Sequence, residues 1–188
     1  MSSTTARALF VCTANECRSP FAEAIANRDA ADLPIRFTSA GLDSWNRGVP
    51  EIGIDLGREM GLDLTAHRSR AVAQVDLASF DLVLALSRNH ARELLAADHS
   101  IGPRLFTLKQ FARWVTDHPR PRRAAVGPWL DAAAADRPVT AFLGADPADD
   151  VDDPVGEPLE YWRRVVGEIE QAIQESLAGL YATSRDDR

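Results

Sequence analysis

The sequence is almost without lysine. Of its 21 basic residues 20 are arginine, and Lys109 is the one lysine. Acidic residues outnumber basic ones by 28 to 21, and the formal net charge is −7. A nucleic-acid-binding protein needs a concentrated positive surface to hold the phosphate backbone. The charge balance therefore argues against nucleic acid as the main partner.

Long apolar runs are also missing. None approaches the roughly 20 residues that a membrane-spanning helix needs, and residues 1–6 lack the basic, apolar and small-residue pattern of a secretory signal. We therefore expect a cytoplasmic protein that has no membrane partner. A length of 188 residues is enough for one domain with a substantial core and too short for two comfortable ones. Residues 1–188 are accordingly predicted to form a single domain.

Cysteine is scarce, and Cys12 and Cys17 lie in one short segment. They cannot join distant parts of the fold, and sparse cysteines of this kind are usually chemical rather than structural. The four histidines show no spacing typical of metal ligands. The nucleotide-binding Gly-x4-Gly-Lys motif is absent, and the acidic run around Asp149 lacks the glycine and glutamate of a calcium loop. We expect no metal and no cofactor.

Short apolar runs alternate with helical patterns along the chain. Strands are predicted at residues 8–11, 35–39, 80–86 and 104–107. Helices are predicted from about Pro20, over about 51–60 and 89–97, through Phe111 and Trp114, and over about 158–180. Strands that alternate with helices form a parallel sheet covered on both faces. The predicted fold class is therefore α/β.

Residues 117–154 do not fit this alternation. The segment opens with prolines and arginines, contains a short predicted helix at about 129–136, and closes with an acidic run at 146–153. A loop of this length in a compact domain is usually functional or mobile. We interpret about 117–145 as an insertion or enlarged loop.

A Cys-x5-Arg motif joins the first predicted strand to the first predicted helix. Its residues are Cys12, Thr13, Ala14, Asn15, Glu16, Cys17, Arg18 and Ser19. In such a loop, successive backbone N–H groups point inward and form a nest for an anion, and the helix dipole adds partial positive charge. The same field stabilises a thiolate. Cys12 is therefore the candidate nucleophile.

The residues after the cysteines extend this chemistry. Arg18 can bind two phosphate oxygens through its planar guanidinium, which a lysine cannot do. Ser19 can donate a hydrogen bond to the thiolate and assist its departure in a second step. The alternative is that Cys12 and Cys17 are only small core residues. The preceding strand, Asn15 and the following Arg-Ser-Pro favour the catalytic interpretation.

The segment from Phe10 to Pro20 resembles the signature of the low-molecular-weight protein-tyrosine phosphatases. That family includes bacterial protein-arginine phosphatases and is related to thioredoxin-coupled arsenate reductases. The resemblance covers most of the chain, because further segments follow in the family's order: Ser39-Ala40-Gly41, Trp45-Asn46, His67-Arg68-Ser69-Arg70, Phe80 to Leu84 and Asp153-Pro154. It implies a four-stranded parallel sheet flanked by helices, a cytoplasmic location, and hydrolysis of protein phosphotyrosine through a phosphocysteine intermediate.

The implied mechanism needs a carboxylic acid that protonates the leaving group and later activates water. In the family this is the aspartate of an Asp-Pro pair before the last helix, which Asp153 matches here. Asp146 also precedes a proline but lies farther from that helix, and Asp152 is expected to be a neighbour of the acid. The alternative is that these residues are solvated acids of an acidic loop.

Other site residues are implied by the resemblance alone. Asn15, Ser39 and His67 are expected to form a hydrogen-bonded network that holds the loop, and Trp45 to form one wall of the pocket. Taken without the resemblance, His67 would be a surface histidine and Trp45 a core residue. Cys17 is a candidate partner for a protective disulfide with the nucleophile. The predicted phosphate-binding positions are the loop residues Thr13, Ala14, Asn15, Glu16, Cys17 and Ser19.

Three positions depart from the family's pattern. Ala14 replaces the usual glycine. An alanine is tolerated at this position only if its φ is below zero. Glu16 replaces an aliphatic residue or threonine, and its carboxylate repels a phosphate dianion unless it points to solvent. It would instead attract a cation such as the guanidinium of phosphoarginine. Val155 stands where the family often has an aromatic wall.

These departures leave the substrate open. A phosphorylated protein is the expected partner, with phosphotyrosine as the default and phosphoarginine as the alternative. A further alternative is a non-catalytic module of the same fold, favoured by Glu16 and the enlarged segment 117–154. Arsenate reductases need additional cysteines, which this chain lacks. An enzyme is favoured by the complete set of Cys12, Arg18, Ser19 and Asp153.

Overall fold

Four short strands form the centre of the molecule. The computed structural model describes residues 5–43 and 45–181, apart from the side chain of Val139. The sheet has the order β2-β1-β3-β4 and all its pairings are parallel. Its strands are β1 (Ala6–Cys12), β2 (Ile35–Gly41), β3 (Leu82–Ala85) and β4 (Leu105–Thr107). The predicted α/β class and four-stranded parallel sheet are confirmed.

The helices follow the strands as predicted, with one shift. Within the described residues they are α1 (Arg18–Asp29), α2 (Glu51–Glu59), α3 (Arg88–Ala97), α4 (Leu108–Asp117), α5 (Val126–Ala133) and α6 (Leu159–Tyr181). Helix α5 begins three residues earlier than predicted, because Val126 and Leu130 are the residues that face the core. Pro128 is tolerated in α5 because it lies in the first turn of the helix, where its missing N–H would have no helical partner. No helix of this part of the chain is long and apolar enough to cross a bilayer.

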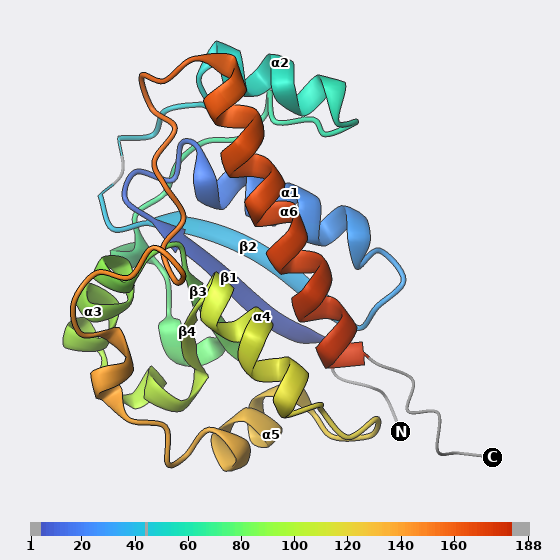
Figure 1. Ribbon diagram of the computed structural model, residues 1–188, viewed down its shortest axis with the longest axis vertical. Coiled ribbons are helices and arrows are strands. Elements are labelled where there is room, and N and C mark those ends of the chain that lie inside the picture. The colour runs from blue at the N-terminus through green and yellow to red at the C-terminus, as the bar shows by residue number, and fades with distance from the viewer. Residues whose placement is uncertain (1–4, 44, 182–188) are drawn as a thin grey trace.

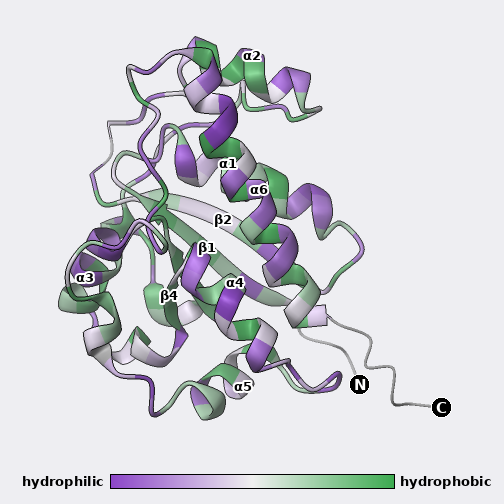
Figure 2. Cartoon of the chain, viewed as in Figure 1, coloured by the Kyte–Doolittle hydropathy of each residue, from purple (hydrophilic) through white to green (hydrophobic). Residues whose placement is uncertain are grey.

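The two faces of the sheet carry cores of different size. Helices α1, α4 and α6 pack over one face, against residues such as Phe10 and Leu84. Helix α3 covers the other face, where Leu9 and Val83 lie. Figure 1 shows α6 running diagonally in front of the sheet, and Figure 2 shows apolar residues concentrated on the central elements. Successive residues of β1 therefore point to opposite faces and both sets are buried, as expected for a parallel sheet.

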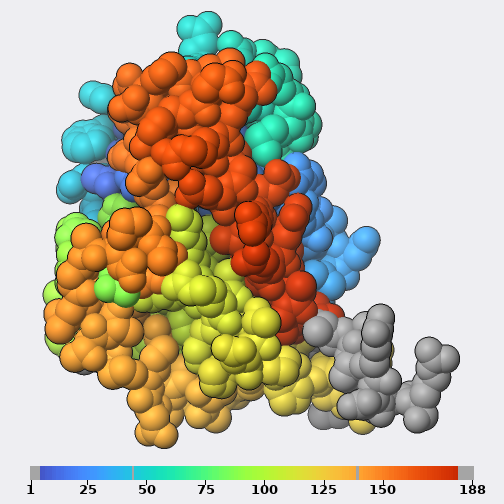
Figure 3. Space-filling model, viewed as in Figure 1, coloured from blue at the N-terminus to red at the C-terminus, as the bar shows by residue number. Residues whose placement is uncertain are grey.

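The segment between α4 and α6 is packed onto the edge of the sheet near β4. In Figure 3 it is the yellow-to-orange surface along the lower left of the molecule. Its helix α5 adds Leu130 to the larger core, and its 3-10 turn Val139–Phe142 adds Phe142 to the smaller one. The interpretation of about 117–145 as an insertion stays a prediction.

Helix α2 lies against the N-terminal part of α6 at Gly53. A Cβ atom on Gly53 would lie 2.7 Å from Val49 Cγ1 and 2.9 Å from Cζ3 of Trp162, which is buried. Side-chain atoms do not approach one another this closely without a shift of the surrounding structure. The absence of a side chain at Gly53 therefore allows α2 and α6 to pack this closely. Helix α6 matters for the site because it follows the predicted catalytic acid, Asp153.

Gly53→Ala is expected to lower the free energy of unfolding by about 1–3 kcal/mol, because the added carbon overpacks this contact. Gly167→Ala on α6 is the matched control. Nothing lies within 4 Å of a Cβ at Gly167, and alanine is the better helix former, so stability is expected to rise by about 0.4–1 kcal/mol. Urea unfolding of the three proteins measures both effects. Equal stabilities for the two variants would contradict this packing.

Candidate active site

The predicted phosphate loop lies at the carboxyl end of the central strand β1. Cys12 is the last residue of β1, and α1 begins at Arg18. The end of β2 holds the loop through its backbone, since Leu42 N donates to Cys12 O at 3.0 Å and Asp43 N to Thr13 O at 2.9 Å. A Cβ on Gly41 would lie 2.7 Å from Thr13 O. Glycine is therefore required at residue 41 for this approach of two backbones.

The thiol of Cys12 is buried and lies 3.0 Å from the hydroxyl oxygen of Ser19. This is the contact through which a serine hydroxyl can stabilise a thiolate. Cys17 is also a buried free cysteine. Burial, with the nearby Asp153 and Cys12, raises the pKa of Cys17 far above its ordinary value. Cys17 is therefore a neutral thiol at physiological pH, and the predicted disulfide with Cys12 stays a prediction.

Asn15 lies at the turn of the loop with a φ of 56°. This left-handed conformation is one that asparagine adopts more readily than most residues. The buried side-chain amide donates to Ser19 Oγ at 3.0 Å and to Ser39 Oγ at 2.8 Å. Its oxygen accepts a hydrogen bond from Arg70 N at 3.1 Å. The amide thus joins α1, β2 and the segment before the 3-10 turn Val72–Gln74 to one point of the loop.

The wider network brings together the supporting residues expected from the sequence. His67 Nε2 lies 2.7 Å from the carbonyl oxygen of Asn15 and must donate to it. Ser39 Oγ donates to Glu23 Oε2 at 2.6 Å. His67 is not a free surface histidine, then, and Glu23 is a member that the sequence analysis missed. Its position on α1, one turn after the serine of the motif, was the available signal.

The guanidinium of Arg18 is the centre of the polar contacts at the mouth of the loop. Its side chain is only 8% exposed, and Nη2 donates to Asp153 Oδ2 at 2.7 Å and to Thr13 Oγ1 at 3.3 Å. Nη1 donates to Val151 O at 3.2 Å. The Nε atom is buried and has no partner among the described residues. A phosphate oxygen in the loop would supply an acceptor for this remaining N–H.

The structure places Asp153, the predicted acid, and the two other aspartates considered, Asp146 and Asp152, in different surroundings. Asp153 pairs with Arg18 at the loop. Asp152 accepts hydrogen bonds from Arg164 and Tyr161, which hold its pKa below the ordinary value. Asp146 lies farther away, 3.1 Å from Arg88. Only Asp153 therefore reaches the predicted clamp.

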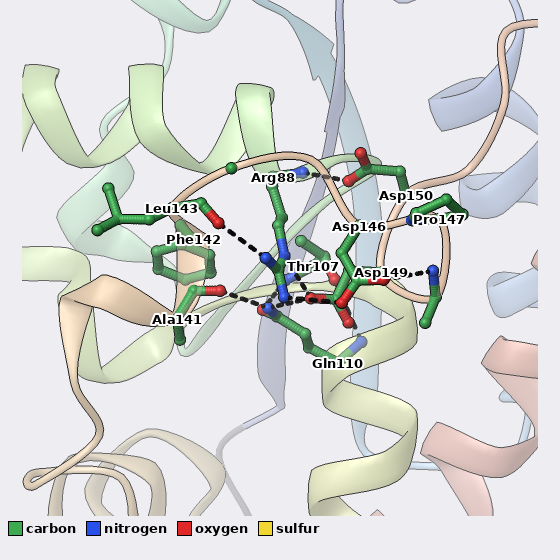
Figure 4. Close-up of polar contacts among 12 residues, drawn as sticks. Arg88, Thr107, Gln110, Ala141, Phe142, Leu143, Asp146, Pro147, Asp149 and Asp150 are labelled. Atoms are coloured by element: carbon green, nitrogen blue, oxygen red, sulfur yellow. Dashed lines mark hydrogen bonds and ion pairs between the residues drawn. The ribbon is translucent and has the colours of Figure 1, made fainter.

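The acidic loop is fixed by Asp149, whose side chain is 1% exposed (Figure 4). Its carboxylate accepts hydrogen bonds from Arg88 Nε at 2.6 Å, from Gln110 Nε2 at 2.6 Å, and from Arg113. Arg88 N also donates to Asp150 Oδ1 at 2.6 Å. Asp149 is therefore a buried and hydrogen-bonded member of the acidic run. A buried carboxylate with this many donors holds the segment that carries the predicted acid.

A pocket of about 230 Å³ opens above the loop. Trp45 and Val155, which are 58% and 61% exposed, stand on its walls, so Trp45 is not a core residue. Ala14 also lines it and keeps a φ outside the left-handed region, as its replacement of glycine requires. Glu16 lines the pocket too, and its Oε1 atom is buried without a hydrogen-bond partner in this part of the chain. Its carboxylate is therefore not directed wholly to solvent.

His90 is a further residue in contact with the loop that the sequence did not predict. It is 4% exposed, and Nε2 lies 2.9 Å from Thr13 Oγ1, while Nδ1 lies 2.8 Å from Ser87 Oγ. Ser87 is the N-cap of α3. The imidazole therefore positions the hydroxyl that accepts a hydrogen bond from Arg18. Residues 5–43 and 45–181 contain no group of three or more histidine, cysteine or acidic side chains placed to hold a metal ion.

Comparison with known proteins finds a family that matches more than half of the chain. Residues 7–120 match the family described as low molecular weight phosphotyrosine protein phosphatase. A low molecular weight protein-tyrosine phosphatase A from Mycobacterium tuberculosis (strain ATCC 25618 / H37Rv) is 42% identical over 92 residues, which are 45% of this chain and 55% of that protein. The match thus spans little more than half the length of this relative.

Two solved structures share the fold along almost the whole chain. A low molecular weight protein tyrosine phosphatase from T. tengcongensis is 28% identical, with 93% of this chain and 99% of that chain covered at a TM-score of 0.69. An arginine phosphatase from Geobacillus stearothermophilus is 27% identical, with 90% and 89% covered at a TM-score of 0.67.

The burial of His90 predicts a dependence of stability on pH. Burial, together with the charge of Arg18, lowers the pKa of His90 to about 3, whereas an unfolded histidine has a pKa near 6.5. As the pH falls below about 6.5, the unfolded chain binds a proton that the folded chain does not. The free energy of unfolding therefore falls from about pH 6.5 towards 3, by up to about 1.4 kcal/mol per pH unit from this residue.

His90→Gln is expected to remove this contribution. Urea unfolding between about pH 4.5 and 6.5 measures it as a shallower loss of stability than in the wild type. His99→Gln is the matched control, because His99 is exposed, and it is expected to keep the wild-type slope. Parallel curves for the wild type and His90→Gln would show that the buried imidazole does not stay neutral.

Proposed function

Since the chain belongs to the low molecular weight phosphotyrosine protein phosphatase family, we propose that it hydrolyses phosphate from phosphorylated proteins, with phosphotyrosine as the substrate group. One observation carries the proposal: Asp153, which lies 135 positions after Arg18 in the sequence, lines the same pocket as Cys12 and Arg18. The family match ends before the loop that bears Asp153. The role of that residue therefore rests on its 2.7 Å contact with the clamp.

In the first step the Cys12 thiolate attacks phosphorus. The S–P bond forms while the bond from phosphorus to the leaving oxygen breaks, and Asp153 gives its proton to that oxygen. Arg18 binds two of the phosphate oxygens. To do so, its Nη2 atom gives up its hydrogen bond to Asp153 and donates to a phosphate oxygen instead. The exchange releases Asp153 at the mouth of the pocket, where it takes up a proton from solvent and acts on the leaving group in its protonated form.

In the second step water attacks the phosphocysteine. Asp153, now a carboxylate, takes a proton from the water, the S–P bond breaks, and inorganic phosphate leaves. Ser19 donates a hydrogen bond to the departing thiolate. The 3.0 Å distance between Ser19 Oγ and Cys12 Sγ is suited to this role. The chemistry requires a reduced cysteine, so the proposal places the protein in the cytoplasm.

Glu16 favours a second candidate substrate, protein phosphoarginine. Its carboxylate lines the pocket of Cys12 and Arg18, and its buried Oε1 has no hydrogen-bond partner among the described residues. A carboxylate so placed repels the phosphate dianion of phosphotyrosine. A guanidinium attached to the phosphorus would offer N–H donors and a positive charge to the same oxygen. One of the structural relatives is an arginine phosphatase.

Hydrolysis of para-nitrophenyl phosphate and phenyl phosphate tests the proposed mechanism. Cys12→Ser is expected to abolish turnover. Asp153→Ala is expected to lower kcat by about 10²–10⁴-fold for phenyl phosphate, with a smaller loss for para-nitrophenyl phosphate, whose leaving group needs a proton less. Asp152→Ala is the matched control, because this neighbouring acid pairs with Arg164 instead. It is expected to stay within a few-fold of the wild type.

Two outcomes would contradict the mechanism. Equal losses in Asp152→Ala and Asp153→Ala would remove Asp153 from the role of acid. Absence of turnover in the folded, reduced wild type would indicate a phosphate-binding module of the same fold, and phosphate titration by calorimetry would then measure binding.

Glu16→Gln tests the substrate class, because it keeps the shape of the side chain and removes its charge. If Glu16 recognises a guanidinium, the ratio of kcat/KM for phosphoarginine over phosphotyrosine peptides is expected to fall by about tenfold or more. The KM for phosphotyrosine peptide is expected to fall, because a repulsive charge is lost. Glu157→Gln, a change of an exposed acid on the loop before α6, controls for net charge. An unchanged ratio in Glu16→Gln would rule out phosphoarginine recognition by this residue.

A further inference from the structure

A second cavity lies on the side of the molecule formed by β4, α4 and the segment before the acidic loop. Its volume is about 270 Å³, and its lining includes Phe106, Trp114 and Arg137. It shares none of its lining residues with the pocket above Cys12. Arg137 belongs to the segment 117–145, for which the phosphatase mechanism has no use.

Arg137 is a cation without a balancing charge. Its Nη2 atom donates to the carbonyl oxygens of Gly102, at 3.1 Å, and Leu105. Its Nε atom is buried without a partner, and none of the described carboxylates lies within ion-pair distance of the guanidinium. Burial lowers the pKa of Arg137 to about 10. The side chain as a whole is half-buried. A charge that is largely withdrawn from water is normally paired, because its transfer from water is otherwise costly.

The walls around this cation are largely aromatic. The guanidinium lies 3.6 Å from the ring centroid of Phe106, and the indole of Trp114 packs at 5.1 Å from the same ring. Trp114 lines the cavity. One acid, Asp117, also lines it, but this residue is exposed and water screens its charge. Phe106 is fully buried beneath the guanidinium. The cavity therefore offers the half-buried indole of Trp114, which stacks on His118 with ring centroids 4.5 Å apart, beside a positive charge without an ion pair.

From this arrangement we propose that the cavity binds a small organic anion that carries a carboxylate on a flat ring. The carboxylate supplies the negative charge that Arg137 lacks, and the ring lies against Trp114. Both hydrogens of Arg137 Nη2 are already donated to carbonyl oxygens, so the carboxylate would accept a charge-assisted hydrogen bond from Nη1. Aromatic surfaces add affinity through stacking.

This site shares two residues with the anchor of the acidic loop. Gln110 and Arg113 line the cavity, and both donate hydrogen bonds to the buried Asp149. Gln110 Nε2 also donates to Ala141 O at 3.0 Å, and Figure 4 shows it between Ala141 and Asp149. A ligand in the cavity therefore contacts the side chains that hold the segment leading to Asp153.

Benzoate and indole-3-carboxylate are the probes for this site, and benzamidine, a ring of similar size with a positive charge, is the control. Binding to the full chain is measured by calorimetry and by amide NMR spectra. Both anions are expected to bind and benzamidine is not. The shifted amides are expected near Trp114 and Arg137 and along residues 146–153.

Three variants locate the binding. Ala141→Phe fills the cavity from a residue that lines it and keeps the backbone acceptor of Gln110, and Arg137→Gln removes the charge. Each is expected to weaken the binding of both anions by about tenfold or more. Ala145→Phe adds the same ring at an exposed position outside the lining and is expected to bind as the wild type does. Far-UV circular dichroism and urea unfolding verify that the cavity variants are folded.

Several results would overturn the proposal. One is that neither anion binds at about 20 mM. Another is that benzamidine binds as tightly as the anions, and a third is that Ala141→Phe binds the anions with the wild-type affinity. If Arg137→Gln fails to fold, Ala141→Phe decides the question alone. Shifts confined to the cavity, with none along 146–153, would overturn the connection to the acidic loop.

Discussion

The shape of the phosphate loop depends on the side-chain amide of Asn15. Its left-handed backbone costs about 1–2 kcal/mol relative to an ordinary conformation, and the cost is offset by the three hydrogen bonds of the buried amide. Two of these end on Ser19 and Ser39, and Ser19 in turn contacts the thiol of Cys12. The nucleophile, the turn of the loop and the end of β2 are thereby fixed to one another. Loss of one partner would leave buried polar groups unsatisfied, which is why such a network acts as a unit.

Polar anchors outside the apolar core position both halves of the site. Asp149 does for the acidic loop what Asn15 does for the phosphate loop. It is buried, and its donors come from α3 and α4. A loop that crosses the surface has few apolar side chains to bury, so its geometry is set by hydrogen bonds to neighbouring helices. The bond from Arg18 to Val151 O then joins the two halves directly.

The parts of this architecture with a local cause could be predicted from the sequence. The strands, the main helices and the Cys-x5-Arg loop follow from short apolar runs, helical spacing and one motif. Asp153 was predicted from a family resemblance, and its contact with Arg18 is what the structure adds. His90 and Asp149 could not be predicted, because their contacts join residues 77 and 61 positions apart. Asp149 lies in an acidic run, and acidic runs are usually exposed to solvent. Its burial is explained only by the hydrogen bonds from Arg88 and Gln110.

The ion pair between Arg18 and Asp153 spans 135 positions of the chain. A ribosome delivers the two ends of that pair at very different times, since synthesis proceeds at about 5–20 residues per second from the N-terminus. For most of that interval the nascent chain carries its thiol and its clamp without the acid. Helix α6, which packs on α1 and α4, is completed last of all the described elements. The pocket is therefore completed only after residues 159–181 have been synthesised and α6 has packed on α1 and α4.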